Sequence, residues 1–344
     1  MILSTREEFK SSLGFSIGIA GEVLTHPTKT ALIGIAKVIK PSKLKTSCEV
    51  ISQIAFRIMV AAVVIFSLPY HLTLGLIGFT LHAIATPLRK KITIIQGPDE
   101  KFSGYQIKVC TFNTALLPDC VNLIKPDDMG SHIAPIPGTL EERVNNIVAA
   151  IELVEADVVC LQEVLDPRAA RLLRQRLSKT YPHMAYNANP QIVRFNSGLM
   201  TLSKTAIDSV AFEEYTDSIG IDSLAGKGYL SVKLQHTAGK VFSVFNTHLN
   251  SDVTITGGFN GYEAEPIREN QIEHLFKDAA PDRDIVCGDL NTLISERKGF
   301  EITRAVIDYI FFPRDSHINS HVNKMNNSSD HPAVVATIKL NKHF

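Results

Sequence analysis

The sequence contains no tryptophan, and only 7% of its 344 residues are aromatic. Any cation–π contact with a ligand must therefore use a tyrosine or phenylalanine ring, which attracts a cation less strongly than an indole does. Cysteine is also sparse, with five residues and no Cys-x-x-Cys pair. This scarcity argues against a cysteine zinc site or a disulfide framework. It predicts that the larger, folded part of the chain faces a reducing, cytosolic compartment.

The five cysteines fall into different surroundings. Cys110, Cys160 and Cys287 lie in apolar, strand-like runs, where a cysteine usually serves as a small buried hydrophobic side chain. Cys48 lies among basic residues close to a long apolar stretch. S-acylation of Cys48 is an alternative to a free thiol there.

The net charge of zero conceals an asymmetry between two parts of the chain. Residues 1–91 hold 11 Lys/Arg against four Glu, whereas residues 92–344 hold 24 Lys/Arg against 31 Asp/Glu. Proteins that grip nucleic acid usually present a basic surface, so the acidic larger part argues against a nuclease and predicts no nucleic-acid partner. The basic part is also the more apolar one, which favours contact with an anionic membrane surface.

The longest apolar run extends from Ile58 to Leu88 without a single charged residue. A membrane-crossing helix needs about 20 apolar residues, and Pro69 divides this longer run into two halves. Arg57 precedes the run and three basic residues, 89–91, follow it. Because positive charge resists translocation, we expect a membrane-associated hydrophobic hairpin over about 58–88. A single kinked span and a buried core helix are the alternatives.

The pattern changes after residue 104 to short apolar runs separated by turns and helices. We therefore expect a membrane-associated helical region over 1–91, a linker rich in glycine and proline over 92–104, and a folded domain over 105–344. Strands mixed with helices predict an α/β fold of two packed sheets flanked by helices. The expected strands are 106–112, 157–161, 197–202, 229–234, 241–246, 284–287, 306–312 and 333–340; the expected helices are 140–155, 167–179 and 267–278.

Polar side chains recur where these expected strands begin or end. Singly, each has an ordinary structural explanation, such as a strand-end carboxylate or a hydrogen-bonded core histidine. If the strand ends converge, however, they form a pocket of hard oxygen ligands beside two imidazoles, as Mg²⁺-assisted attack on a phosphate ester requires. The residues are Asn113, Gln162, Glu163, Asn196, Ser197, His248, Asn250, Asp289, Asn291, Asp308, Asp330 and His331.

The order Glu…SG…THL…GDLN…IDY…SDH resembles the endonuclease/exonuclease/phosphatase superfamily, which implies a four-layered α/β sandwich (DNase I-like). The chain is most similar to neutral sphingomyelinases, in particular the membrane-anchored type-2 form. That similarity lies in ALLPD (115–119), CLQEVLDPRAARLLRQRL (160–177) and IDSLAGKGYLSVKL (221–234), and in the hydrophobic N-terminal part. The long polar insertion that this form carries before the equivalent of Glu163 is almost absent here, which leaves regulation through it unsupported.

The resemblance assigns roles to the metal-binding and proton-transferring residues. It implies that Glu163 binds Mg²⁺, or alternatively Mn²⁺, with support from Asn113 and Asp330. It also implies that His331 is the general base and that Asp308 orients it. Asp289 remains an alternative base.

The remaining roles concern the substrate. The resemblance implies that Asp289 and Asn291 position water or phosphate oxygens, and that His248 donates to the phosphoryl oxygens or the leaving group. Lys227, paired with Asp222 as a switch, is expected to contact the phosphate or headgroup, and Asn196 is grouped with them as a substrate residue. The plain alternative for Asp222 and Lys227 is a surface ion pair worth about 0–1 kcal/mol.

The implied reaction is phospholipase C-type hydrolysis of sphingomyelin to ceramide and phosphocholine. Its partners would be membrane lipids, with anionic phospholipids as activators and no obligatory protein partner. A phosphoinositide or other lipid phosphatase is an alternative that needs a basic cluster, for which Lys227, Arg194 and Arg268 are the candidates. A DNase-like endonuclease and a non-catalytic membrane scaffold are further alternatives.

Overall fold

The computed structural model describes residues 92–118, 138–189, 195–237, 239, 241–252, 261–323 and 329–340, with five helical positions between 70 and 80. The chain divides into two compact units, residues 1–90 with 119–125 and residues 91–118 with 126–344. The predicted hairpin over 58–88 lies outside the described residues apart from those five positions, as do Cys48 and Cys120. Among the described residues, no helix is both long and apolar enough to span a membrane. The predicted domain limits and localisation stay predictions.

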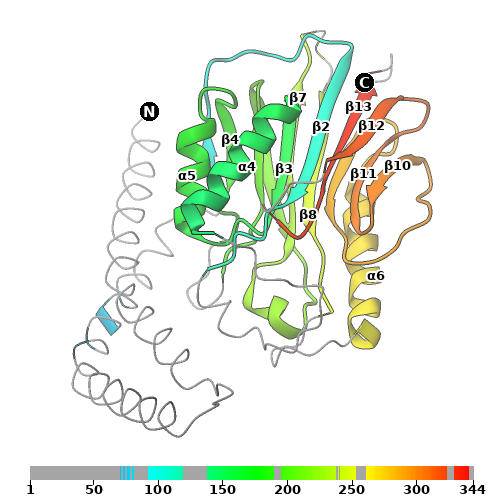
Figure 1. The fold of residues 1–344 in the computed structure, drawn as a ribbon. Coiled ribbons are helices and arrows are strands. Elements are labelled where there is room, and N and C mark those ends of the chain that lie inside the picture. Colours follow the sequence, from blue (N-terminus) through cyan, green and yellow to red (C-terminus); the bar gives the residue numbers. More distant parts are fainter. Residues whose placement is uncertain are drawn as a thin grey trace, which may run out of the picture. The chain divides into compact units, whose positions relative to one another are not determined.

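The second unit contains two mixed β-sheets (Figure 1). The first sheet has the order β1 (Thr93–Ile95), β4 (His183–Tyr186), β5 (Met200–Ser203), β3 (Val158–Gln162), β2 (Gln106–Asn113), β13 (Ala333–Lys339) and β12 (His317–Asn323). The second has the order β10 (Phe300–Ala305), β11 (Asp308–Pro313), β9 (Ile285–Asp289), β8 (Val241–His248), β7 (Gly228–Gln235) and β6 (Ile207–Glu214).

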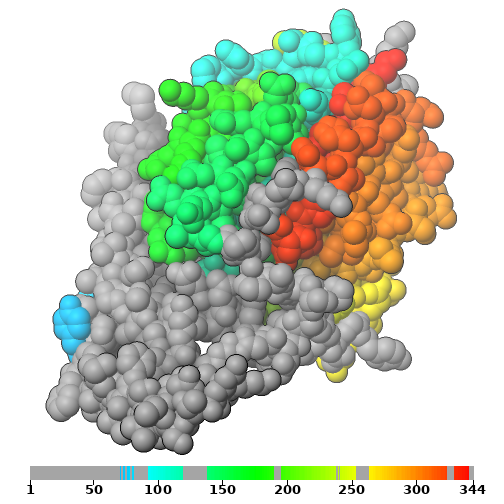
Figure 2. Space-filling model, viewed as in Figure 1, coloured from blue at the N-terminus to red at the C-terminus, as the bar shows by residue number. Residues whose placement is uncertain are grey.

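Apolar side chains on both faces of each sheet create four layers. A buried core that includes Val109, Cys160 and Cys287 fills the space between the sheets. Helices α4 (Leu140–Val154) and α5 (Pro167–Leu177) cover the outer face of the first sheet, while α6 (Gly261–Asp278) packs on the second (Figure 1). The predicted helix–sheet–sheet–helix sandwich is therefore confirmed in the described part of this unit. Figure 2 shows the green surface of α4 and α5 beside the orange and red surface of the C-terminal strands.

Both helices on the first sheet begin at the residues that the sequence indicates. Asp166 accepts hydrogen bonds from the backbone N–H groups of Arg168 and Ala169, and a proline follows it in the first turn. Thr139 and Glu142 form a reciprocal capping box at the start of α4. These caps satisfy backbone donors that would otherwise lack partners at the helix ends.

One parallel strand pair in each sheet positions the polar strand ends. Strand β2 runs parallel to β3, and β8 runs parallel to β9, so each pair ends at one edge of its sheet. Strand β11 is antiparallel to β9, and its first residue, Asp308, pairs with Asp289. Strand β13 is likewise antiparallel to β2 and pairs Val334 with Thr111, so β13 begins where β2 ends. Four strand ends and two strand starts therefore meet in one region.

Five strands of the described part of the chain were not predicted: β1, β4, β6, β10 and β12. Strand β1 lies within the segment predicted as a linker and pairs with β4, while Phe102 of the same segment is buried against the ring of His236. The sheet therefore begins inside 92–104. Strands β6, β10 and β12 are also additions, and β12 is exposed along nearly its whole length. Pairing with a neighbouring strand of the sheet, rather than local pattern, makes them strands.

Candidate active site

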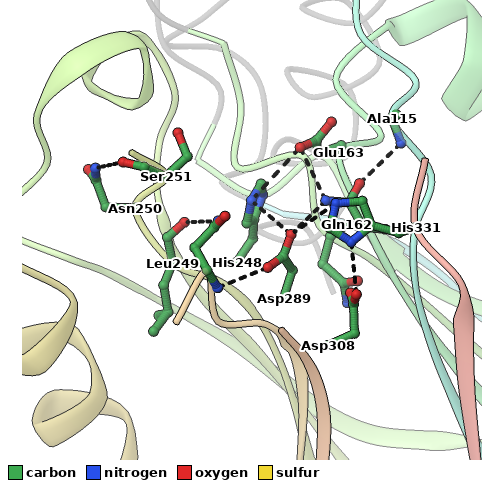
Figure 3. Close-up of polar contacts among 12 residues, drawn as sticks. Ala115, Gln162, Glu163, His248, Leu249, Asn250, Ser251, Asp289, Asp308 and His331 are labelled. Atoms are coloured by element: carbon green, nitrogen blue, oxygen red, sulfur yellow. Dashed lines mark hydrogen bonds and ion pairs between the residues drawn. The ribbon is translucent and has the colours of Figure 1, made fainter. Parts of the chain in front are cut away.

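Five ionisable side chains meet between the ends of the central strands (Figure 3). The Nε2 atom of His248 lies 3.9 Å from Oε1 of Glu163 and 3.7 Å from Oδ2 of Asp289. The Nε2 atom of His331 lies 3.7 Å from the same Asp289 oxygen, and its Nδ1 lies 2.8 Å from Oδ2 of Asp308. The two histidines thus flank the carboxylate of Asp289. The sequence had indicated these residues only by their positions at strand ends.

Glu163 lies directly after β3, in a left-handed backbone conformation with φ 58°. A non-glycine residue seldom adopts this conformation, and such residues concentrate at functional sites. The Nδ2 atom of Asn113 donates to Oε1 of Glu163 at 3.1 Å and to Oδ2 of Asp289 at 2.9 Å. Asn113 therefore joins a carboxylate of the first sheet to a carboxylate of the second.

His331 and Asp308 form a hydrogen-bonded dyad that is nearly closed to solvent on the aspartate side. The side chain of Asp308 is 1% exposed and that of His331 is 19% exposed. Burial alone would lower the pKa of His331, but its hydrogen bond to Asp308 and the charge of Asp289 raise it to about 10. Burial and the nearby Asp289 charge raise the pKa of Asp308 to about 7. In this surrounding of carboxylates the imidazole holds its proton.

The pKa of His248 is shifted in the opposite direction to that of His331. Burial and the neighbouring charge of Lys227 lower the pKa of His248 to about 4, so its ring is neutral at pH 7. A neutral imidazole carries one N–H group that can donate a hydrogen bond to a phosphoryl oxygen. Both histidines lie near carboxylates, but His248 is more deeply buried and also lies near the ammonium group of Lys227, so the two differ in protonation.

Lys227 and Asp222 form a buried ion pair beside His248, not a surface one. The Nζ atom of Lys227 lies 2.9 Å from Oδ1 of Asp222 and donates to the Leu249 carbonyl at 3.1 Å. The lysine side chain is only 3% exposed. The backbone N–H and the hydroxyl of Ser251 both donate to the other oxygen of Asp222, at 2.6 and 2.7 Å. The plain surface-pair interpretation is therefore wrong, whereas a switching role stays a prediction.

The Leu249 carbonyl connects this ion pair to the GDLN segment. It accepts from Nδ2 of Asn291 at 3.1 Å as well as from Lys227. Asn291 has φ 51°, and its backbone N–H donates to Oδ1 of Asp289 at 2.9 Å. Asp289 and Asn291 thus belong to one hydrogen-bonded turn. Burial would raise the pKa of Asp289, but the charge of His331 and the hydrogen bond from Asn113 lower it.

Two of the predicted residues lie apart from the main cluster. Asp330 is exposed and accepts from the hydroxyl of Ser329 at 3.4 Å, although its charge contributes to the raised pKa of Glu163 after burial itself. Asn196 donates to Asn187 at 2.9 Å and accepts from the backbone of Gly198 at 2.7 Å. In the described part of the structure, Asn196 thus orders its own loop.

Solvent reaches the cluster from the side of Glu163 and His331. The side chains of these two residues are 21% and 19% exposed, whereas those of Asp289 and Asp308 are 1% exposed and that of His248 is 8% exposed. A ligand that enters the cluster therefore meets Glu163 and His331 first. Asp289 and Asp308 lie deeper in the site, where solvent does not reach them.

Residues 110–331 match the model of the Endonuclease/Exonuclease/phosphatase family. The chain belongs to this family. The matched region contains nearly two thirds of the chain and includes every residue of the cluster. The predicted superfamily resemblance is confirmed at this level.

Among curated family members, the chain is 33% identical over 162 residues to sphingomyelin phosphodiesterase 5 of Danio rerio; the alignment covers 42% of this chain and 30% of that protein. It is 25% identical over 217 residues to sphingomyelinase C 2 of Leptospira interrogans, which covers 57% and 32% of the two chains. The chain thus spans less than a third of the length of these relatives. A solved structure of beta toxin from Staphylococcus aureus with bound magnesium ions has a TM-score of 0.53 at 16% identity, over 68% of this chain and all of that one. This last likeness concerns the fold.

The chemistry of the cluster fits a hard divalent cation. Burial and the charge of Asp330 raise the pKa of Glu163, which shows that this carboxylate lacks full compensation. Asp289, Asp308 and His331 also place one ligand atom each within 4.8 Å of one another. The dyad hydrogen bond already occupies one oxygen of Asp308 and Nδ1 of His331, so Glu163 is the better candidate ligand.

Sequence reasoning named Gln162 but missed Asn246, its hydrogen-bond partner beneath the site. The Nε2 atom of Gln162 donates to Oδ1 of Asn246 at 2.7 Å, across the space between the sheets. Nδ2 of Asn246 donates to the carbonyls of Leu161 and Met200. Both amides are fully buried. The sequence did contain a signal for this pair, because each amide interrupts an apolar strand close to a site residue.

Proposed function

We propose that this family member is a Mg²⁺-dependent sphingomyelin phosphodiesterase that releases phosphocholine from sphingomyelin at a membrane surface and leaves ceramide behind. The observation that carries the proposal is the convergence of Glu163, His248, Asp289 and the His331–Asp308 dyad at one solvent-accessible point. The choice of substrate rests on the matched segments and on the names of the curated relatives. Mn²⁺ is the alternative cation.

Each residue has a defined task in this proposal. Glu163 holds the cation with help from Asn113, which fixes its carboxylate by the hydrogen bond at 3.1 Å. When bound, the divalent cation spreads the negative charge of the phosphoryl oxygens and offsets the carboxylates around His331. With those charges offset, the His331 ring would be neutral, and it would accept a proton from the attacking water through Nε2, because Asp308 occupies Nδ1.

The second histidine and the turn after β9 act on the substrate. His248, neutral and held beside Asp289, donates its N–H toward a phosphoryl oxygen or the leaving oxygen of ceramide. Asp289 lies between the two histidines and remains the alternative base. The cationic choline group is compatible with the acidic balance of residues 92–344.

A lipid phosphatase would need a cluster of basic side chains that are free to bind additional phosphate groups. Arg268 is bound by Asp252 and Glu265, and Lys227 is bound by Asp222. Arg194 lies outside the described residues. Within the described part of the chain, the candidate cations are thus already engaged by carboxylates.

The test is phosphocholine release from sphingomyelin vesicles by the purified full chain. We expect release with Mg²⁺, its loss with EDTA, its recovery when Mg²⁺ returns, and a loss of about 10³-fold or more in His331→Ala, because the base is removed. The matched control is His321→Ala, which changes an exposed histidine of β12 and should leave the rate unchanged. Phosphate release from an inositol lipid without sphingomyelin turnover would favour the lipid phosphatase, and plasmid nicking lost in Glu163→Gln would favour the endonuclease.

A further inference from the structure

The turn between β10 and β11 contains a residue that its backbone does not favour. The last strand pair joins Ala305 to Asp308, so the turn consists of Val306 and Ile307. Val306 has φ 53° and is 70% exposed. Positive φ in a two-residue hairpin turn is usually supplied by glycine or asparagine, and a β-branched residue is strained there. Neither turn chemistry nor core packing explains this valine.

A second exposed aliphatic side chain lies beside this turn. Leu293 follows Asn291 by two residues and is also 70% exposed. Its loop is fixed to the turn, because the backbone N–H of Leu290 donates to the carbonyl of Ile307 at 2.9 Å. The two aliphatic residues therefore belong to two linked segments, and each lies two positions from a residue of the active site.

The same edge carries a positive charge. The exposed side chain of Arg304 donates from Nη1 to the carbonyl of Val306 at 3.2 Å, and its Cζ lies 5.9 Å from the ring centre of Tyr309. The hydroxyl of Tyr309 donates to the Thr292 carbonyl and accepts from the N–H of Ile294. The arginine is thus connected to the turn on one side and, through Tyr309, to the Leu293 loop on the other.

We propose that Leu293, Arg304 and Val306 form a docking surface for a lipid bilayer at the end of the second sheet that carries Asp289 and Asp308. Aliphatic side chains that enter the acyl region, next to an arginine that meets the anionic phosphates of headgroups, are typical of interfacial binding. A protein partner would need about 800 Å² on this side, which two aliphatic side chains do not supply. The inference deepens the proposed function and rests on it for the identity of the bilayer's substrate lipid.

A single tryptophan tests the contact without relying on turnover. Because the chain contains no tryptophan, Leu293→Trp reports on position 293 alone, even in the full chain. In a Glu163→Gln background, vesicles of phosphatidylcholine, phosphatidylserine and sphingomyelin should shift its emission to shorter wavelength, and brominated lipid should quench it. The matched control is Leu153→Trp, an equally exposed site near the end of α4, which should show neither change. Equal responses at 293 and 153, or none at 293, would overturn the docking surface.

Activity measurements separate docking from folding and from catalysis. Val306→Gly removes the aliphatic side chain and relieves the backbone, so the Tm should rise by about 2–4 °C. The same variant should hydrolyse sphingomyelin vesicles about tenfold more slowly, at unchanged rate on a water-soluble phosphodiester. Arg304→Gln should lose about fivefold on vesicles that contain phosphatidylserine. An unchanged vesicle rate in both variants would contradict the docking surface. If the tryptophan responds to vesicles but the enzyme hydrolyses no sphingomyelin, the proposed function is wrong and the docking surface is still supported.

Discussion

Asp308 determines which nitrogen of His331 is available to a ligand. Its Oδ2 atom lies 2.8 Å from Nδ1, so Nε2 points toward Asp289 and the solvent side of the cluster. The second oxygen, Oδ1, is buried and has no hydrogen-bond partner among the described residues. A buried carboxylate held in this way stabilises one ring orientation more than it stabilises the fold.

We expect Asp308→Asn to lower kcat by about 10³–10⁴-fold, because an amide selects the ring tautomer less well and does not balance an imidazolium. The affinity for Mg²⁺, measured by calorimetry, should change little. Asp308 raises the pKa of His331, so the variant's acidic pH–rate limb should shift to lower pH. Asp282→Asn, at an exposed position, is the control. An unshifted limb together with normal kcat would remove Asp308 from the dyad.

The ion pair of Lys227 and Asp222 gives a second prediction at this scale. Asp222→Asn would leave an ammonium group that is 3% exposed without its counter-charge, which typically costs about 3–5 kcal/mol. The double variant Asp222→Asn with Lys227→Met should regain most of that loss in urea unfolding. If the single and double variants lose equal stability, the charge pairing is not the source of the cost.

The same pair predicts the direction of a pH effect. Burial would raise the pKa of Asp222, but the charge of Lys227 lowers it below the ordinary value of 3.8. A lowered folded-state pKa contributes stability that is present above the unfolded pKa and is lost as the pH falls through the folded one. Between pH 4 and pH 2, unfolding free energy should therefore fall more steeply in the wild type than in the double variant.

At the scale of elements, the amides of Gln162 and Asn246 join β3 to β8 across the core. Glu163 follows the first amide directly and His248 lies two residues after the second, so the 2.7 Å hydrogen bond sets the separation of two site residues. Asn246→Leu should cost about 1–3 kcal/mol, since the Gln162 donor and two carbonyls lose a partner.

A double-mutant cycle tests whether this hydrogen bond positions the site. If the pair acts as a unit, Gln162→Leu combined with Asn246→Leu should cost less than the sum of the single variants. Each single variant should also lower kcat while KM for a water-soluble phosphodiester stays unchanged. Additive losses of stability with unaltered kcat would reduce the pair to ordinary core packing.

The sequence predicted the central elements better than the edges. Strands β2, β3, β8 and β9 are rich in apolar residues and almost entirely buried, and short-range pattern is enough to find them. Strand β12, with the sequence HINSHVN, is exposed and polar, and only pairing with β13 makes it a strand. Edge strands carry little local signal for this reason.

The same distinction applies to the site. Glu163, His248, Asp289 and His331 were predictable because each ends or precedes an apolar run, and parallel central strands bring such ends together. The Leu249 carbonyl that links Lys227 to Asn291 was not predictable, because every residue has a carbonyl. Contacts of backbone atoms across distant segments leave no pattern in the sequence.

For the whole molecule, the separation of charge along the chain has the clearest consequence. Residues 1–91 carry seven more basic than acidic residues, and residues 92–344 carry seven more acidic than basic ones. At a bilayer with anionic lipid, the first part is attracted and the larger part is repelled. A chain with this distribution would approach such a surface with its N-terminal part.

This asymmetry predicts that the activity of the full chain on vesicles depends on both anionic lipid and salt. Added phosphatidylserine should raise sphingomyelin hydrolysis, and raising NaCl from about 0.05 M to 0.5 M should cancel most of the increase, because the Debye length falls to about 4 Å. Hydrolysis of a water-soluble phosphodiester over the same salt range is the control and should stay nearly constant. If salt lowers both rates equally, screening acts on the active site, and the basic N-terminal residues do not recruit the enzyme to anionic membranes.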